Sequence, residues 1–499
     1  MAVLKKIILR MSLLVLLLIP MNYIYKYFFL QQDLEKYSEL INLVKQIPDD
    51  ADIIYVAESS NITYRSNDQD KRYISEMLAD YYTDLKVYDI TKPAGHGGVY
   101  KVLLQNIPKT SKAKTIIVTL NLRSFNASWK NSVLETSLQK SLVLLKDYPP
   151  LFNRFMLSFK AYDIKNKKER ERLIAKEWKS TTINFPYTAP YNNIFEWDLW
   201  MANNGFRDKN GKKDKKKVQL ACSYIKAYGF QIDTNTNVRI KDFDDIVELA
   251  GERGWQLVFN LLPENTQTAE KLVGDDLIYL MEHNRRLLVD YYTSKGVIVI
   301  DNLNAVDSEE FVDQNWTTEH YAELGRKIIA EKIALKLEPV YPESFNEVTY
   351  TDEMKSIFLN NCDGNHVWGH SKTISNTGSY SGNYSSKTGK GNDYSISFEY
   401  PLSGIPDSLK NSISISLKAY QYSKEHKASL IVSAKSGKTS NYWKAFRLSS
   451  KLNEVNKWED YKLTINITDK IKQSEMIKVY VLNKSNSIIL IDDFLVEFN

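Results

Sequence analysis

Short apolar runs and amphipathic stretches alternate along the chain from residue 50 to about residue 337. Five of the runs have the length and composition of buried strands, at residues 53–57, 86–90, 115–120, 255–262 and 297–301. Stretches of helical character separate most of them, at residues 73–82, 100–104, 132–145 and 277–292. Strands that are apolar throughout and alternate with helices indicate a parallel sheet covered on both faces. We therefore expect a three-layer α/β domain over residues 50–340.

The alternation is interrupted between residues 147 and 253. This stretch contains a charged helical segment at 166–179, an aromatic segment at 195–200 and a lysine-rich loop at 209–217. An insertion of this size in an α/β domain is typical of a lid or a substrate wall.

Beyond Pro339–Pro342 the helical signals stop. Residues 346–499 contain stretches with period-two alternation at 394–400, 412–418 and 461–467, and Gly, Ser and Asn turns separate them. This pattern predicts an all-β sandwich of the jelly-roll type as a second domain.

The first 30 residues have the pattern of a membrane anchor. Lys5, Lys6 and Arg10 precede an apolar segment over residues 11–29, close to the ~20 residues that span a bilayer. Basic residues before the span place the N-terminus in the cytoplasm and the remainder outside the membrane. A cleaved signal peptide is the alternative, but no small-residue cleavage site follows the apolar run, which favours an uncleaved anchor. Residues 31–49 then predict a linker helix.

Composition excludes several classes of protein. The net charge of +5 is spread over 66 basic and 61 acidic residues, which is too dilute to indicate nucleic-acid binding. The only two cysteines, Cys222 and Cys362, lie in different predicted domains, so they cannot form a disulfide framework. No Cys/His spacing indicates a zinc site.

The candidate chemistry lies at the two ends of the α/β region. Ser59 directly follows the first predicted strand, so we expect its side chain at the carboxyl edge of the sheet, where open α/β sheets bind ligands. His320 begins the amphipathic segment 321–334, and we expect Thr317 or Thr318 to cap this helix. A serine hydroxyl needs a neighbouring base, and a neutral imidazole in the first turn of a helix is suited to that role.

Two further strand ends supply candidate oxyanion donors. Residues 92–99, with Gly95 and Gly98, follow the second strand, and glycines let backbone N–H groups approach a ligand closely. Asn121 follows the third strand, and its side-chain amide could donate to the same oxygen.

These ordered landmarks resemble the SGNH/GDSL hydrolase superfamily, in which Ser, Gly and Asn follow strands one to three and an Asp-x-x-His comes late. The resemblance covers residues 50–337 outside the 147–253 insertion. It implies an SGNH-like α/β fold with Ser59 as nucleophile and His320 as base. Gly98, or as second choice Gly95, and Asn121 would then be oxyanion donors.

The sequence departs from the family pattern at three positions. Glu58 replaces the usual Asp before the nucleophile, and a strict count places Arg123 rather than Asn121 at the family's Asn. Thr317 stands three residues before the histidine, where the family has Asp. Asp313 is the nearest upstream acid and our first choice for the triad, and Glu319 is the second choice.

The C-terminal region resembles jelly-roll carbohydrate-binding modules. The segments 457–463 and 491–497 match the late strands of such modules. The resemblance implies a structural calcium, with Asp492 or Asp493 as a ligand. Trp368 and Trp443, together with Tyr380 and Tyr384, are candidate sugar platforms, and the alternative is that these aromatic residues belong to the core.

The two resemblances together imply an extracytoplasmic serine esterase or O-acyltransferase that removes or adds acyl groups, above all acetyl, on a cell-surface polysaccharide. A membrane anchor is common among the polysaccharide acyltransferases and D-alanyl-transfer proteins of the superfamily. The implied partners are the polysaccharide, the membrane and a membrane-bound protein that delivers the acyl donor, and catalysis needs no cofactor. The alternative is a non-catalytic, glycan-binding envelope protein that retains the fold, which Thr317 supports.

Overall fold

The computed structural model describes residues 2–66, 68–207, 209–348, 357–362, 368–369, 371–402, 405–437 and 439–499. They form two compact units. The first unit comprises Met1–Thr63 and Ile74–Glu347, and the second comprises Tyr64–Tyr73 and Val348–Asn499. The short segment Tyr64–Tyr73 therefore leaves the first unit just after Ser59 and belongs to the second.

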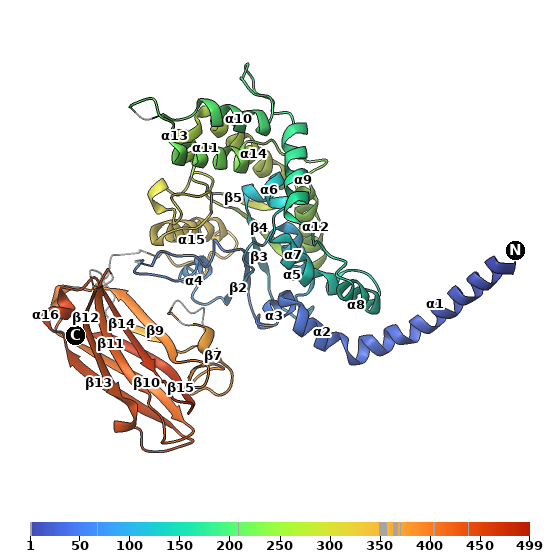
Figure 1. Cartoon of the computed structure of the whole chain (residues 1–499). Helices are drawn as coiled ribbons and strands as arrows, with labels where there is room; N and C mark the ends of the chain where they lie inside the picture. The colour runs from blue at the N-terminus through green and yellow to red at the C-terminus, as the bar shows by residue number, and fades with distance from the viewer. Residues whose placement is uncertain are drawn as a thin grey trace. The chain divides into compact units, whose positions relative to one another are not determined.

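The first unit is built on a five-stranded parallel sheet (Figure 1). Its strands are β1 (Ile53–Ala57), β2 (Val87–Thr91), β3 (Thr115–Leu120), β4 (Gln256–Leu261) and β5 (Ile298–Asp301). They lie in the order β2-β1-β3-β4-β5, and every neighbouring pair is parallel. The prediction of a parallel α/β sheet is confirmed. Every residue of β1 and β3 is buried, which explains their continuous apolar character.

Helices cover both faces of this sheet. On one side α4 (Ile74–Ala79) packs against α15 (Glu323–Leu337), and on the other α5 (Gly97–Gln105) packs against α12 (Val238–Arg253). Phe259 of β4 joins the second layer to the sheet. Its ring centroid lies 5.3 Å from that of Phe243 on α12 and 4.8 Å from that of Tyr292 on α14 (Asp275–Ser294).

The region between β3 and β4 is helical. It contains α6 (Ala127–Lys130), α7 (Glu135–Leu142), α8 (Pro150–Ser158), α9 (Lys167–Ser180), α10 (Ile194–Asn204), α11 (Lys215–Tyr228) and α12. Trp197 of α10 is fully buried and stacks on Tyr191 with ring centroids 4.5 Å apart, which anchors these helices to the unit's hydrophobic core. Because α12 covers the sheet, the last part of the predicted insertion belongs to the α/β layers themselves.

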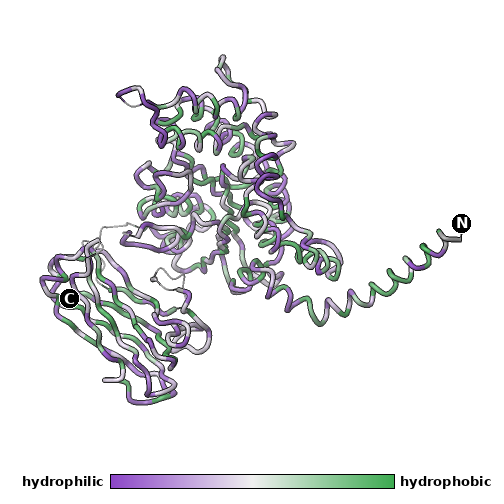
Figure 2. Tube along the Cα trace, in the orientation of Figure 1, coloured by the Kyte–Doolittle hydropathy of each residue, from purple (hydrophilic) through white to green (hydrophobic). Residues whose placement is uncertain are grey.

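The chain begins with one long apolar helix, α1 (Ala2–Phe28). Its segment Lys6–Phe28 has 23 residues with a mean hydropathy of 2.1, and it is long and apolar enough for a membrane anchor or a signal sequence. Figure 2 shows this hydrophobic character along most of α1. The linker predicted as one helix is two, α2 (Leu30–Tyr37) and α3 (Glu39–Val44). They divide at Ser38, whose hydroxyl donates to the carbonyl of Ser141.

The second unit is an antiparallel β-sandwich, as the alternating pattern predicted (Figure 1). One sheet has the order β13-β10-β15-β8-β7, with β6 pairing with β15, and the other has the order β12-β11-β14-β9. The strands are β6 (Ile357–Asn360), β7 (Ile374–Ser375), β8 (Ser385–Thr388), β9 (Tyr394–Pro401), β10 (Ser412–Gln421), β11 (Ser429–Ser436), β12 (Thr439–Arg447), β13 (Trp458–Asn466), β14 (Met476–Leu482) and β15 (Ile489–Phe498), with the short helix α16 (Asp469–Lys472) before β14. Along β10 every second residue is buried, so one face of the strand lines the core.

Phe259→Ala tests the packing of the first unit. Removing a fully buried ring from the centre of the sheet should lower the free energy of unfolding of this unit by about 3–5 kcal/mol. Leu199→Ala, at a residue 53% exposed on α10, should cost less than about 0.5 kcal/mol. Denaturant unfolding of the full chain checks both values, and equal losses in the two variants would contradict this packing.

Candidate active site

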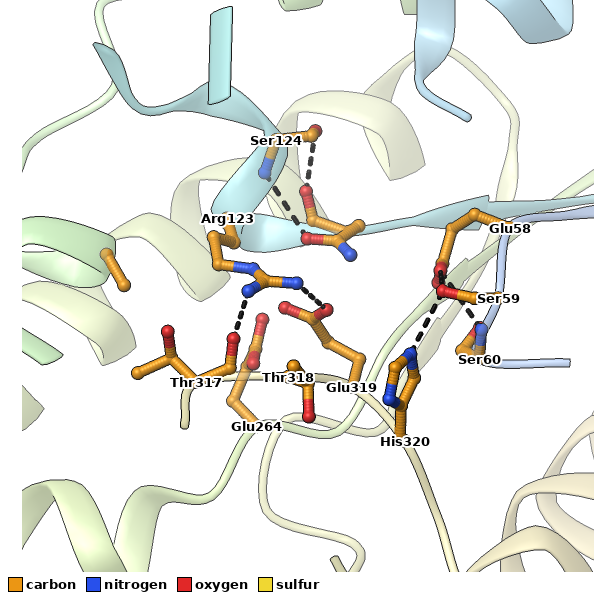
Figure 3. A network of polar contacts seen from close by, with 12 residues as sticks. Glu58, Ser59, Ser60, Arg123, Ser124, Glu264, Thr317, Thr318, Glu319 and His320 are labelled. Carbon is orange, nitrogen blue, oxygen red and sulfur yellow. Dashed lines mark hydrogen bonds and ion pairs between the residues drawn. The ribbon is translucent and has the colours of Figure 1, made fainter. Parts of the chain in front are cut away.

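The structure brings together three of the residues selected from the sequence. Ser59 lies two residues beyond the end of β1, and its Oγ is 3.0 Å from Nε2 of His320 (Figure 3). The other ring nitrogen of His320, Nδ1, is 2.7 Å from Oδ2 of Asp313. These are hydrogen-bond distances, and the order Ser–His–Asp is that of a nucleophile, a base and the acid that orients the base.

The turn after β1 holds Ser59 in place. Asn61 is fully buried, and its Nδ2 donates to the hydroxyl of Thr91 at the end of β2 over 2.8 Å. Its Oδ1 accepts from the backbone N–H of Ser75 in α4 at 3.0 Å. Asn61 thus ties the turn to the neighbouring strand and to the next helix. Because β1 lies between β2 and β3, Ser59 stands where the strand order of the sheet reverses, the usual place for ligands in open α/β sheets.

His320 does not lie in the first turn of a helix, and this part of the sequence prediction is wrong. α15 begins at Glu323, and its N-cap residue, Ala322, makes no side-chain cap. His320 instead belongs to a two-stranded turn in which its carbonyl accepts from the N–H of Val312 at 2.8 Å. The ring of His320 is therefore not carried by the first turn of a helix as we expected.

Asp313, seven residues before the histidine, makes the contact expected of a triad acid. Burial raises the pKa of the Asp313 carboxyl, but hydrogen bonds from Thr318 and His320 outweigh it, and the pKa is lowered overall. The Thr318 hydroxyl donates to Oδ2 of Asp313 at 2.6 Å, so Thr318 orients the acid and does not cap a helix. An ionised Asp313 accepts the Nδ1 proton of His320, which leaves Nε2 as the acceptor for Ser59.

Arg123 and Glu319, both second choices from the sequence, pair with each other (Figure 3). Nη2 of Arg123 is 2.5 Å from Oε2 of Glu319, and Nη1 donates to the carbonyl of Thr317. The guanidinium also lies over the ring of Trp129, 4.9 Å from its centroid. Burial lowers the pKa of Arg123 while Glu319 raises it, and the net shift is upward, so the group stays charged. Arg123 therefore fixes the segment that leads into His320.

Three glutamates are buried in this region, and sequence reasoning did not select two of them, Glu58 and Glu264, as site residues. The exposed fractions of Glu58, Glu264 and Glu319 are 4%, 1% and 1%. Burial, with repulsion from Glu319 second, raises the pKa of both Glu58 and Glu264. Glu264 comes just after β4, so the rule that polar residues at strand ends line the site could have identified it.

Glu58 contacts the candidate nucleophile directly. Its Oε2 is 3.0 Å from Oγ of Ser59 and accepts the N–H of Ser60 at 3.0 Å. A carboxylate here would compete with His320 for the single hydroxyl proton of Ser59. Burial raises the pKa of the Glu58 carboxyl, which favours its neutral form, and a neutral carboxyl competes less strongly with His320 for the Ser59 proton than a carboxylate does.

The oxyanion candidates occupy different local settings. The Oδ1 of Asn121 accepts from the N–H of Ser124 at 3.3 Å, while no described residue accepts from its Nδ2. Gly95 donates its own N–H to the carbonyl of Lys92 at 2.8 Å, which closes a turn. Gly98 lies in the first turn of α5, where a Cβ would meet the Asp242 carboxylate at 3.1 Å, so its lack of a side chain serves the packing of α5 on α12. Their roles as oxyanion donors remain predictions.

The aromatic candidates of the second unit separate into core and surface. Trp368 is 9% exposed, and its ring lies 5.3 Å from those of Phe398 and Phe494, so it is a core residue and not a sugar platform. Trp443 on β12 is 56% exposed and approaches Tyr480 on the same sheet. Tyr380 and Tyr384 are 49% and 38% exposed.

Asp492 and Asp493 do not fit a calcium site. Oδ2 of Asp492 accepts from the N–H groups of Tyr380 and Ser381 at 2.7 and 3.2 Å, and Oδ1 accepts from the N–H of Asp493. Oδ1 of Asp493 accepts the hydroxyl of Ser381 at 2.6 Å. Within the described residues no group of three or more His, Cys, Asp or Glu is placed to hold a metal ion. The two aspartates instead hold the turn at residues 379–382.

Comparisons with known proteins give only distant likenesses. No family model and no curated protein matches the chain. Among solved structures, a two-domain esterase (CEX) active on acetylated mannans, co-crystallised with mannopentaose, is 8% identical, with 90% of this chain and 91% of that chain covered and a TM-score of 0.24. The CBM27-1 module of Caldicellulosiruptor saccharolyticus in complex with mannohexaose is 11% identical, with 28% and 96% covered and a TM-score of 0.20. The CBM22-1 xylan-binding domain of Paenibacillus barcinonensis Xyn10C is 12% identical, with 28% and 81% covered and a TM-score of 0.18. These likenesses are too distant to assign this chain an activity.

Asp313→Asn tests the assignment of the acid. If Asp313 holds the imidazole in its working tautomer, this variant should lower kcat for ester hydrolysis by about 10⁴-fold without changing KM or the melting temperature. Glu319→Gln is the matched control, because Glu319 pairs with Arg123 and not with the ring of His320. A loss of kcat in Glu319→Gln as large as that in Asp313→Asn would contradict the assignment.

Glu264→Gln tests the buried carboxyl groups. A carboxyl whose pKa is higher in the folded than in the unfolded protein stabilises the fold fully only below its unfolded pKa, and this contribution is lost as the pH rises toward the folded value. The amide still accepts the Tyr228 hydroxyl but cannot ionise. The melting temperature of the variant relative to wild type should therefore increase from about pH 5 to about pH 8. Glu270→Gln, at an exposed residue, should show no such trend, and a pH-independent difference for Glu264→Gln would contradict the raised pKa.

Proposed function

We propose that the first unit is a serine-dependent acyl-transfer enzyme of the SGNH type, an esterase or an O-acyltransferase. The observation that carries this proposal is the continuous set of contacts from Asp313 through His320 to Ser59, at 2.7 and 3.0 Å. A serine that only ended strand β1 would not require a histidine and an aspartate as hydrogen-bond partners. The combination of nucleophile, base and orienting acid is what activates a serine hydroxyl.

The reaction follows from these contacts. Nε2 of His320 takes the Ser59 proton as Oγ attacks the acyl carbon, and the protonated imidazole returns that proton to the leaving alkoxide. The acyl group is then an ester of Ser59. Water or a sugar hydroxyl, deprotonated by His320, attacks the ester, and Ser59 leaves with its proton restored. The backbone N–H of Ser59 and the amide of Asn121 are the proposed donors to the oxyanion, with Gly98 as the third.

The proposed substrate is an acylated, above all acetylated, polysaccharide. An enzyme with a β-sandwich that binds glycan can keep such a polymer close to its nucleophile by multivalent attachment. Trp443 supports this role because a large exposed indole on a sheet offers a stacking surface for a sugar ring. In this proposal α1 anchors the protein outside the cytoplasm, beside a membrane-bound protein that supplies the acyl donor.

Ser59→Ala tests the proposed reaction. The full chain in detergent should hydrolyse p-nitrophenyl acetate and react with a fluorophosphonate probe, and Ser59→Ala should lower both activities by at least about 10³-fold. Ser60→Ala is the matched control, because Ser60 is the neighbouring serine and its buried Oγ has no partner among the described residues. Probe labelling that persists in Ser59→Ala would exclude Ser59 as the nucleophile. An inert wild-type protein would favour the non-catalytic, glycan-binding alternative.

Trp443→Ala tests the sugar platform. Loss of one stacking indole should weaken binding of an acetylated polysaccharide about tenfold, or about 1.4 kcal/mol. Tyr422→Ala is the control, since Tyr422 is 43% exposed and follows β10 in the other sheet. Affinity electrophoresis compares polysaccharide binding by the two variants. Weaker binding in Tyr422→Ala alone would contradict the prediction, because it would place the glycan on the opposite sheet.

A further inference from the structure

Helix α8 (Pro150–Ser158) packs along the second half of the apolar helix α1 (Figure 1). Between them lies an open groove of about 580 Å³. Its walls are mostly apolar, with Val15, Leu18 and Ile19 from α1 facing Leu151, Phe152 and Phe155 from α8. The groove is therefore continuous with the part of α1 that is long and apolar enough to cross a membrane.

The exposed face of α8 is aromatic. Tyr148, Phe152, Phe155 and Phe159 are 55%, 47%, 40% and 81% exposed. Phe152 and Phe155, three residues apart, share one side of α8, while Leu157 on the opposite side packs into a small core. Tyr148 precedes the N-cap of the helix and its ring contacts that of Phe152 at 5.5 Å between centroids, and Phe159 is the C-cap residue. We call these four residues the aromatic stripe. Exposed rings gathered in this way mark an interaction surface rather than an ordinary protein surface.

The position of α8 along α1 sets the depth of the aromatic stripe. The α1 residues that line the groove run from Val15 to Tyr23, and the apolar segment ends at Phe28. At 1.5 Å per residue, Val15 lies roughly 20 Å and Tyr23 roughly 8 Å before that end. A bilayer that contains the apolar segment of α1 therefore extends to the level of Phe152 and Phe155.

The start of α8 leaves few backbone groups without a partner. Pro150, the first helical residue, has no N–H to satisfy, and the N–H of Leu151 donates to Oδ1 of Asn22 in α1 at 3.0 Å. Nδ2 of Asn153 donates to the carbonyl of Lys146 at 2.8 Å and also approaches that of Tyr148. Backbone groups in hydrocarbon must find partners within the protein, because no water is available there. The start of α8 meets this requirement.

An ion pair holds α8 against the anchor just beyond this level. Nε of Arg154 is 2.6 Å from Oδ2 of Asp33 in α2, and the hydroxyl of Tyr25 donates to the same oxygen at 3.0 Å. The guanidinium also lies over the ring of Tyr37. Aromatic and basic side chains of this kind are typical of the interface between lipid and water.

We propose that the aromatic stripe of α8 is inserted into the bilayer that α1 spans, with phospholipid acyl chains filling the groove between the two helices. The first unit is then attached to the membrane at two points, α1 and α8, and not through a flexible tether. This inference is independent of the proposed acyl transfer, because it uses no residue of the candidate active site.

Spin-label accessibility in the full chain tests the insertion. Nitroxide labels on Phe155→Cys and Phe159→Cys, reconstituted into vesicles of phosphatidylcholine and phosphatidylglycerol, should be more accessible to oxygen than to a water-soluble nickel chelate. Leu199→Cys on α10, at a residue whose exposed fraction of 53% lies between those of Phe155 and Phe159, is the control and should show the reverse order. The native Cys222 and Cys362 are buried, and the unsubstituted protein measures any background labelling.

Nickel accessibility at residues 155 and 159 several-fold below that at residue 199, together with oxygen accessibility above that at residue 199, supports insertion. Accessibility equal to that at residue 199 would mean that the aromatic stripe faces water, which overturns the proposal. Exclusion of both reagents would mean that protein covers the stripe, which overturns it equally, and dipolar broadening between labels would then identify a second copy as the cover.

Discussion

The hydrogen bond between Asp313 and Nδ1 of His320 is the interaction on which the rest of the site depends. A hydroxyl 3.0 Å from an imidazole becomes a nucleophile only when the facing nitrogen is unprotonated, and the acid on the far side of the ring decides which nitrogen that is. The surrounding structure keeps this contact in place. Thr318 orients the acid, and Arg123 holds the residues that lead into the histidine.

The buried charges around Ser59 are the second constraint. Arg123 is the cation that pairs with Glu319, and two further carboxyl groups, Glu58 and Glu264, are buried near them. The pKa values of Glu58 and Glu264 are raised by burial and by repulsion from Glu319. The neutral form of each carboxyl avoids the cost of burying a second and a third negative charge beside Glu319. A neutral Glu58 competes less strongly than a carboxylate with His320 for the Ser59 proton.

Much of the fold follows from the sequence because the signals are local. Strands β1 and β3 of the parallel sheet are continuous apolar runs, and strand β10 of the sandwich alternates with period two, so each could be recognised from its own residues. Ser59 and Asn121 were selected by the same logic, as polar residues directly after buried strands. The start of α15 was misplaced because a segment with helical composition begins with the turn that carries His320, where pairing with residues 310–312 overrides the local preference.

Other features depend on tertiary contacts that sequence patterns do not contain. No pattern in the sequence indicates that the segment Tyr64–Tyr73 belongs to the second unit. The burial of Trp368 and of the glutamates Glu58, Glu264 and Glu319 is likewise not visible in their local sequence. Asp313 could be nominated as the nearest upstream acid, but only the folded turn, in which Phe311 pairs with Tyr321, shows that a seven-residue separation reaches the ring. The spacing of three residues between acid and histidine does not apply here, because residues 311–321 form a turn.

The proton on Nδ1 of His320 offers the most direct test of this arrangement. A proton shared with an ionised carboxylate should give a resonance far downfield in the ¹H NMR spectrum, present in the wild-type full chain and in Ser59→Ala. The account predicts that Asp313→Asn removes this resonance, while Glu319→Gln retains it. A downfield resonance that persists in Asp313→Asn would contradict the account, because another group would then hold the imidazole.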